Sequence, residues 1–328
     1  MGLSDETNRC RSNRPLHPQY VQVHALILTW SFHDLRTAPY TAPPSADYIS
    51  LEDETQRLRG TLESYGYEVH EFLIPMQRSL EAVQSKLRQF TRLAAEDTLL
   101  IVYYHGHGSL DDDNELVFSS HEYPNDIQWS QAAAAELYKA MVTGEACLHR
   151  QSDRYHELTK KYERYRPVSE IKWDAIRPIV LGAACDLLLI LDCCAAGGAN
   201  LRHVNWQPPP AAEGFTKHLF AACGFESSTS DDMTAALCDV LDAWVPGEGL
   251  PRSDDDPNNK LAQPSVVSPF LTTKRLHLIM EDRLQKGSAG SQPIFKQLLP
   301  QDPEQYITLP NLRHVRVAER GRRGYFVE

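Results

Sequence analysis

Six short runs of apolar residues recur along the chain, separated by stretches in which apolar residues repeat at helical spacing. Strands that are covered on both faces read as continuous apolar runs rather than as alternation. The pattern therefore predicts an α/β fold with a six-stranded, mostly parallel sheet and helices on both faces. The predicted strands are residues 24–30, 67–74, 98–104, 186–191, 219–223 and 294–299.

Two of these runs, TLLIVYY at 98–104 and DLLLIL at 186–191, are the most continuously apolar. We expect them to form the centre of the sheet, because central strands are buried on both faces. Between the runs, helical periodicity predicts helices that can act as crossovers. The clearest helical stretches are residues 51–62, 80–93, 233–241 and 270–284.

The periodic part of the chain predicts one domain over residues 22–310. Residues 1–21 form a polar segment that we expect to be disordered, and residues 311–328 form a C-terminal tail. The long gap before the fourth strand contains an alanine-rich helix and an insertion that is basic and rich in tyrosine. The predicted irregular segments are the insertion at 146–167 and the Pro- and Gly-containing loops at 199–216 and 245–268.

Composition and charge exclude several classes of protein. The net charge of −11 argues against a nucleic-acid partner, which needs a basic surface to bind phosphates. No apolar run approaches the roughly 20 residues of a membrane-spanning helix, and the first twenty residues are polar rather than a secretory signal. We therefore expect a cytoplasmic protein without membrane insertion.

The seven cysteines are odd in number and irregularly spaced, which indicates reduced thiols rather than a disulfide framework. Cys193 and Cys194 are the only close pair, and no second cysteine or histidine pair accompanies them at the spacing of a metal site. The sequence thus predicts no zinc site.

The first motif with chemical potential is YYHGHG, at the end of the third apolar run. The carboxyl ends of parallel strands face the ligand crevice of an α/β sheet. A histidine between glycines at this point, His107, is therefore placed to meet a ligand. An isolated HGH sequence also fits a metal ligand or an ordinary loop histidine.

The second motif is LDCCAAGG, at the end of the fourth run. Strand alternation places Leu191 and Cys193 on one face, and Asp192 and Cys194 on the other. Cys193 is then a core residue and Cys194 the accessible thiol. Two buried structural cysteines remain the alternative reading.

Taken together, the motifs predict a thiol and an imidazole in one crevice. A free thiol is only a few per cent ionised at neutral pH, so a histidine that accepts its proton activates it. The backbone N–H groups of Gly108 and Cys194 can stabilise an oxyanion, each by about 3 kcal/mol.

The segments TLLIVYYHGHG and DLLLILDCCAAGGA resemble the histidine and cysteine boxes of caspase-like peptidases, in particular metacaspases and fungal caspase-domain proteins. LFAACGFESS and QPIFKQLL resemble later strands of the same family, so the resemblance covers roughly residues 22–310. It implies a caspase-like three-layer sandwich, a Cys-His dyad, a thioester intermediate, protein or peptide substrates and no organic cofactor.

Residue by residue, the resemblance assigns the catalytic histidine to His107 and the nucleophile to Cys194, with Gly108 and Cys194 as oxyanion donors. Metacaspases place an acid two residues before the nucleophile, and Asp192 matches it. This implies cleavage after Arg or Lys. The family's second pocket acid falls on the Glu52-Asp53-Glu54 run, where we favour Asp53. The alternative for Asp192 is a carboxylate that caps its own loop.

The chain also departs from the family, because Ala195-Ala196 replaces the usual His-Ser pair after the nucleophile. The acidic runs Asp111–Asp113 and Asp254–Asp256 offer ligands for activating calcium, although such runs are usually only solvated. The basic insertion and the loop with Arg202 carry residues at which an Arg- or Lys-specific enzyme would cut itself.

The leading hypothesis is a regulated cysteine endopeptidase, with a role in cell death or defence that rests on the family alone. One alternative is a catalytically weak caspase-like scaffold that binds partners through the same crevice. Another is a different cysteine hydrolase, which would gain nothing from Asp192. The sequence leaves the oligomeric state and the natural substrate open.

Overall fold

The computed structural model describes residues 20–33, 35, 51–120, 169–200, 208–223, 233–244, 270–287, 292–299 and 305–313. Several predictions lie outside this part of the chain. They concern most of the N-terminal segment, the alanine-rich helix, the insertion, residues 201–207 of the first irregular loop, the whole second loop and most of the C-terminal tail.

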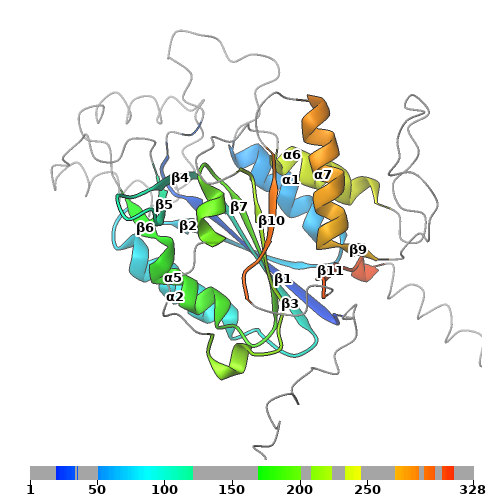
Figure 1. Ribbon diagram of the computed structural model, residues 1–328, viewed down its shortest axis with the longest axis horizontal. Coiled ribbons are helices and arrows are strands. Elements are labelled where there is room, and N and C mark those ends of the chain that lie inside the picture. Colours follow the sequence, from blue (N-terminus) through cyan, green and yellow to red (C-terminus); the bar gives the residue numbers. More distant parts are fainter. Residues whose placement is uncertain are drawn as a thin grey trace, which may run out of the picture.

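A six-stranded sheet forms the middle layer of the molecule (Figure 1). Its last strand in the sequence is antiparallel to its neighbour, and every other pairing is parallel. All six predicted strands are confirmed, and the two most apolar runs form the adjacent central strands β7 and β3. In spatial order the strands are β10 (Ile294–Gln297), β8 (Lys217–Ala221), β7 (Asp186–Asp192), β3 (Thr98–His105), β1 (Gln22–Trp30) and β2 (Glu68–Ile74).

Helices cover both faces of this sheet, which confirms the predicted three-layer α/β sandwich (Figure 1). One face carries α1 (Leu51–Ser64), α6 (Met233–Ala243) and α7 (Thr273–Gly287), and the other carries α2 (Ser79–Thr91) and α5 (Trp173–Leu181). The core is divided accordingly. Tyr103 and Ile190 pack on the side of α1 and α6, whereas Tyr104 and Leu191 pack on the side of α2 and α5.

Several short strands and turns, which the apolar pattern did not predict, lie in the segments that connect the main strands and helices. A three-stranded antiparallel sheet follows β3 directly and consists of β4 (His107–Leu110), β5 (Leu116–Ser119) and β6 (Glu170–Lys172). Strands β9 (Leu271–Thr272) and β11 (Thr308–Leu309) pair elsewhere, and two 3₁₀ turns, η2 (Ala196–Asn200) and η3 (Pro210–Ala212), occupy connections.

None of the helices in the described part of the chain combines the length and the apolar composition that crossing a bilayer requires.

His218 on β8 makes folding sensitive to pH. Its side chain is buried, its Nδ1 lies 2.9 Å from the Thr273 Oγ1, and burial lowers its pKa to about 3. The folded protein therefore keeps this ring neutral, while the unfolded chain protonates it below about pH 6.5. The contribution of the neutral His218 ring to the free energy of unfolding is fully present above pH 6.5, and it decreases as the pH falls toward 3.

We expect acidification from pH 7.5 to pH 5.0 to lower the free energy of unfolding by about 2 kcal/mol more in the parent protein than in His218→Gln. Urea unfolding of both proteins at the two pH values measures this difference. Equal losses in the two proteins would show that His218 is not the group responsible.

Candidate active site

The backbone of His107 is fixed by an aromatic side chain from the preceding strand. The Tyr104 hydroxyl donates a hydrogen bond to the His107 carbonyl oxygen at 2.8 Å and accepts one from the Trp30 indole N–H at 2.9 Å. Gly106 lies directly over this phenol, and a Cβ at this position would overlap the Tyr104 hydroxyl. The glycine before His107 is therefore required by close packing rather than by an unusual φ.

Cys194 lies in a tight turn between β7 and η2. The next residue, Ala195, has a left-handed φ of 53°, which is uncommon for a residue with a side chain and costs about 1 kcal/mol. The Gly198 N–H closes the turn by donating to the Ala195 carbonyl at 2.8 Å. This conformation ends the strand abruptly and leaves the Cys194 side chain half-buried.

The register of the two central strands brings these turns together. His105 pairs with Asp192 across the β3–β7 ladder, so His107 and Cys194 each lie two residues beyond the same pair. The Gly106 N–H is 3.4 Å from the Asp192 carbonyl oxygen, and a Cβ at Gly108 would overlap the Cys194 carbonyl oxygen. The backbones of the two motifs are thus in contact, and the His107 side chain is half-buried like that of Cys194.

The two adjacent cysteines have different environments. Cys193 is 1% exposed and packs in the core with Leu189 and Leu191, as strand alternation predicted. Burial raises the pKa of the Cys193 thiol well above its usual value, and Cys223 and Asp192 add to the effect. Cys193 therefore stays protonated, and Cys194 is the more accessible thiol of the pair.

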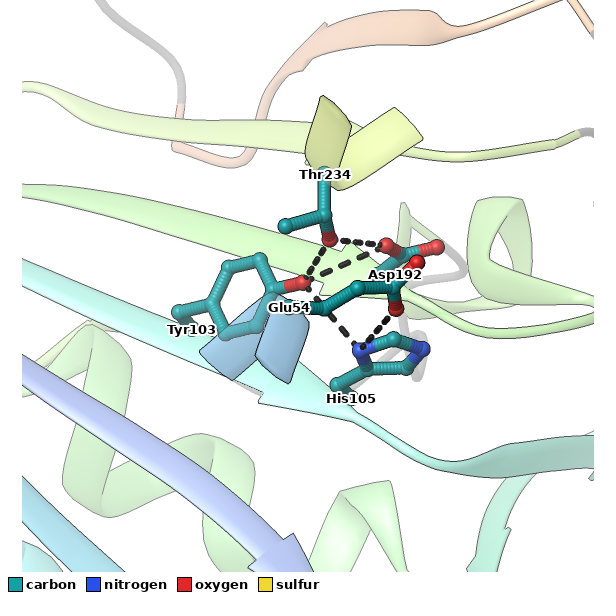
Figure 2. Close-up of polar contacts among 5 residues, drawn as sticks. All are labelled: Glu54, Tyr103, His105, Asp192 and Thr234. Carbon is teal, nitrogen blue, oxygen red and sulfur yellow. Dashed lines mark hydrogen bonds and ion pairs between the residues drawn. The ribbon is translucent and has the colours of Figure 1, made fainter. Parts of the chain in front are cut away.

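On the face of the sheet opposite to Cys193, polar side chains form a buried cluster at the end of β7 (Figure 2). We call Glu54, Tyr103, His105, Asp192 and Thr234 the acidic cluster. Asp192 is buried, and its Oδ2 accepts hydrogen bonds from the Thr234 hydroxyl at 2.6 Å and the Tyr103 hydroxyl at 3.2 Å. The Tyr103 and Thr234 hydroxyl oxygens also lie in contact with each other.

His105 and Glu54 complete the acidic cluster (Figure 2). The His105 Nδ1 lies 3.5 Å from the Tyr103 hydroxyl and 3.8 Å from the Glu54 Oε2, and both side chains are largely buried. Burial raises the pKa of Tyr103 well above its usual value, and the Asp192 carboxylate raises it further. The phenol therefore remains a hydrogen-bond donor to Asp192 at all physiological pH values.

The structure places Glu54, and not the predicted Asp53, in the acidic cluster. Asp53 lies on the exposed side of α1, whereas Glu54 is 4% exposed. The physical reason is the phase of the helix, because Glu54 follows Leu51 by three residues and precedes Leu58 by four, in the buried stripe. Helical periodicity is thus the signal in the sequence that distinguishes the buried acid from its two neighbours. Thr234 carries no comparable signal in the sequence.

The acidic turn after β4 is held by contacts within the protein. The Asp111 carboxylate accepts hydrogen bonds from the backbone N–H groups of Asp113 and Glu115, and it pairs with the Lys172 ammonium at 2.6 Å. Lys172 and these N–H groups lower the pKa of Asp111, so the carboxylate is ionised and already neutralised by a cation. The second predicted calcium run, Asp254–Asp256, lies outside the described residues.

Comparison with known proteins identifies a family and several similar structures. A family model described as the Caspase domain matches residues 50–236, a range that contains both motifs. Caspase-1 from Spodoptera frugiperda is similar in structure, with a TM-score of 0.42 and 12% sequence identity over 90% of this chain and 92% of that chain. Raptor from Chaetomium thermophilum has a TM-score of 0.34 and 12% identity over 68% of this chain and 18% of that chain. The comparison with curated proteins finds no match.

The contact between Gly108 and Cys194 predicts a strong effect of a single methyl group. In Gly108→Ala the added Cβ must push the Cys194 peptide away, which we expect to destabilise the protein by about 2 kcal/mol. Gly60→Ala is the matched control, because the space around Gly60 in α1 is open and alanine favours a helix by up to about 1 kcal/mol. Chemical denaturation measures both, and equal stability of the two variants would contradict the close approach.

Proposed function

The chain belongs to the Caspase domain family of cysteine peptidases, and from this we propose that it is a cysteine endopeptidase that cleaves proteins after Arg or Lys. The observation that carries the proposal is the contact of the two turns, in which Gly108 packs on the Cys194 peptide. It supports a dyad of His107 and Cys194, because two half-buried side chains follow the ends of neighbouring strands. No organic cofactor is required for this chemistry.

In the proposed mechanism, His107 accepts the proton of the Cys194 thiol, and the thiolate attacks the carbonyl carbon of the scissile peptide bond. The N–H groups of Gly108 and Cys194 are the proposed donors to the oxyanion. His107 then protonates the leaving amine as the C–N bond breaks, which leaves a thioester on Cys194. Water hydrolyses the thioester, with His107 as the base, and releases the second product.

The acidic cluster supports a preference for basic residues at the cleaved bond. It places two buried carboxylates, Glu54 and Asp192, around the Tyr103 hydroxyl. Buried carboxylates are stable only when hydrogen-bond donors or cations compensate their charge. Tyr103 and Thr234 supply neutral donors, and an Arg or Lys side chain of the substrate would supply positive charge.

A role in regulated cell death or defence signalling, a cytoplasmic location and self-cleavage in the basic insertion belong to the same proposal. They follow from the family resemblance and from the sequence of the insertion, and not from the geometry of the site.

Substitution of each adjacent cysteine tests the nucleophile. We expect the parent protein to hydrolyse fluorogenic peptides with Arg or Lys, but not Asp or Leu, at the cleaved position. Cys194→Ala should lower kcat/KM by at least roughly 1,000-fold, because the nucleophile is lost. Cys193→Ala should stay within about tenfold of the parent value, because this thiol is buried and protonated. Folded parent protein that cleaves none of the four peptides would favour a scaffold.

Paired substitutions in α1 test the pocket. Glu54→Gln removes a buried charge of the acidic cluster and should lower kcat/KM for Arg and Lys peptides by about 10- to 100-fold, as expected for one charged hydrogen bond. Asp53→Asn removes an exposed neighbouring charge and should change kcat/KM less than twofold.

Asp192→Asn should reduce cleavage of the same peptides at least as strongly as Glu54→Gln, since Asp192 is two residues from the proposed nucleophile. If both variants lose thermal stability but keep their preference for Arg and Lys, the acidic cluster holds α1 and α6 against the sheet and is not a substrate pocket.

A further inference from the structure

At the opposite end of the sheet, three side chains that can bind metals converge. His24 is the third residue of β1, and it pairs in the parallel register with Glu68, the first residue of β2. Alternation along β2 places His70 on the same face as Glu68. One ligand atom from each of the three residues lies within 4.8 Å of the others, the one such set of three among the described residues.

The separations suit a small metal ion. The His24 Nδ1 is 3.2 Å from the Glu68 Oε2, and the His70 Nε2 is 3.4 Å from the Glu68 Oε1. Two ligands on a tetrahedral zinc ion, each about 2.0–2.1 Å from the metal, are roughly 3.3 Å apart. The two imidazole rings are stacked, with centroids 6.1 Å apart, and the Phe90 ring of α2 packs edge-on against His70.

His24 is oriented like a metal ligand. The side chain is 8% exposed, and its Nε2 lies 3.3 Å from the Gln22 Oε1. A metal-binding histidine usually donates its other ring N–H to such an oxygen, which turns the remaining lone pair toward the metal. The His24 Nδ1 and the His70 Nε2 are buried, and neither makes a hydrogen bond of good geometry with the described residues.

We propose that His24, Glu68 and His70 bind a divalent transition-metal ion of the zinc class, with two imidazole nitrogens, one carboxylate and a water molecule as ligands. Glu68 has a side chain that is 63% exposed, so the ion can enter from solvent. Imidazole suits zinc-class ions, whereas a set with two nitrogens is a poor match for calcium or magnesium. The ion would join the edge strand β2 to β1, far along the sheet from His107 and Cys194.

Zinc titration of the full chain tests the proposal. The protein carries Cys194→Ala, because the thiol of the proposed dyad would compete for the metal, and it is treated with a chelator beforehand. Isothermal titration calorimetry with Zn²⁺ should give one equivalent bound at micromolar or lower Kd. Co²⁺ should give the visible absorption of a tetrahedral site with nitrogen and oxygen ligands, without a thiolate charge-transfer band.

Variants in the same background locate the ion. Glu68→Gln should weaken Zn²⁺ binding at least tenfold and His70→Ala about 100-fold, since each removes a ligand. Glu71→Gln is the matched control on β2, because Glu71 alternates to the other face and pairs with Arg59 at 3.3 Å, and it should leave the Kd within twofold. Circular dichroism checks that each variant is folded. Absence of Zn²⁺ binding by the folded parent, or unchanged binding in Glu68→Gln and His70→Ala, would overturn the proposal.

Discussion

The parallel pairing of β3 with β7 is the constraint on which the rest of the structure depends. Apart from the polar residues at their two ends, these strands carry only aliphatic residues and two tyrosines, so burial on both faces fixes them side by side at the centre. A shift of one residue in this register would exchange the faces of Tyr103 and Tyr104, or of Leu191 and Asp192. The contact between the histidine and cysteine turns therefore follows from the hydrophobic core.

The alternation of side chains at the end of β7 places Cys193 and Asp192 in different environments. Cys193 enters the apolar layer beneath α2 and α5, where its thiol is inert, while Asp192 enters the opposite layer among polar partners. There the Asp192 carboxyl group accepts hydrogen bonds from two hydroxyls, and an imidazole lies beside Glu54. In the proposed function, a basic side chain of the substrate would donate to the carboxylate oxygens of the acidic cluster.

Much of this fold can be predicted from the sequence, and the features that cannot be predicted have physical reasons. Continuous apolar runs revealed all six main strands, and parity along β7 distinguished Cys193 from Cys194. The β4–β6 sheet was missed because strands of three or four residues in connecting segments carry little periodicity. Composition does not distinguish Asp53 from Glu54, and only the phase of the helix shows that Glu54 is the buried acid. The proposed metal ligands come from two strands. They come together only when β1 and β2 pair, so their spacing in the sequence does not reveal them.

The hydrogen bonds that run from Trp30 through Tyr104 to the His107 carbonyl extend the site into the core beneath α2 and α5. Trp30 ends β1, a strand that carries neither motif. Residues 30, 104 and 106 form one packing unit, so a bulkier or smaller ring at either aromatic position requires a matching change at the other, and a side chain at 106 has no room at all. In related sequences these three positions should vary together, and they would report the geometry of the histidine turn even where the proposed catalytic residues are invariant.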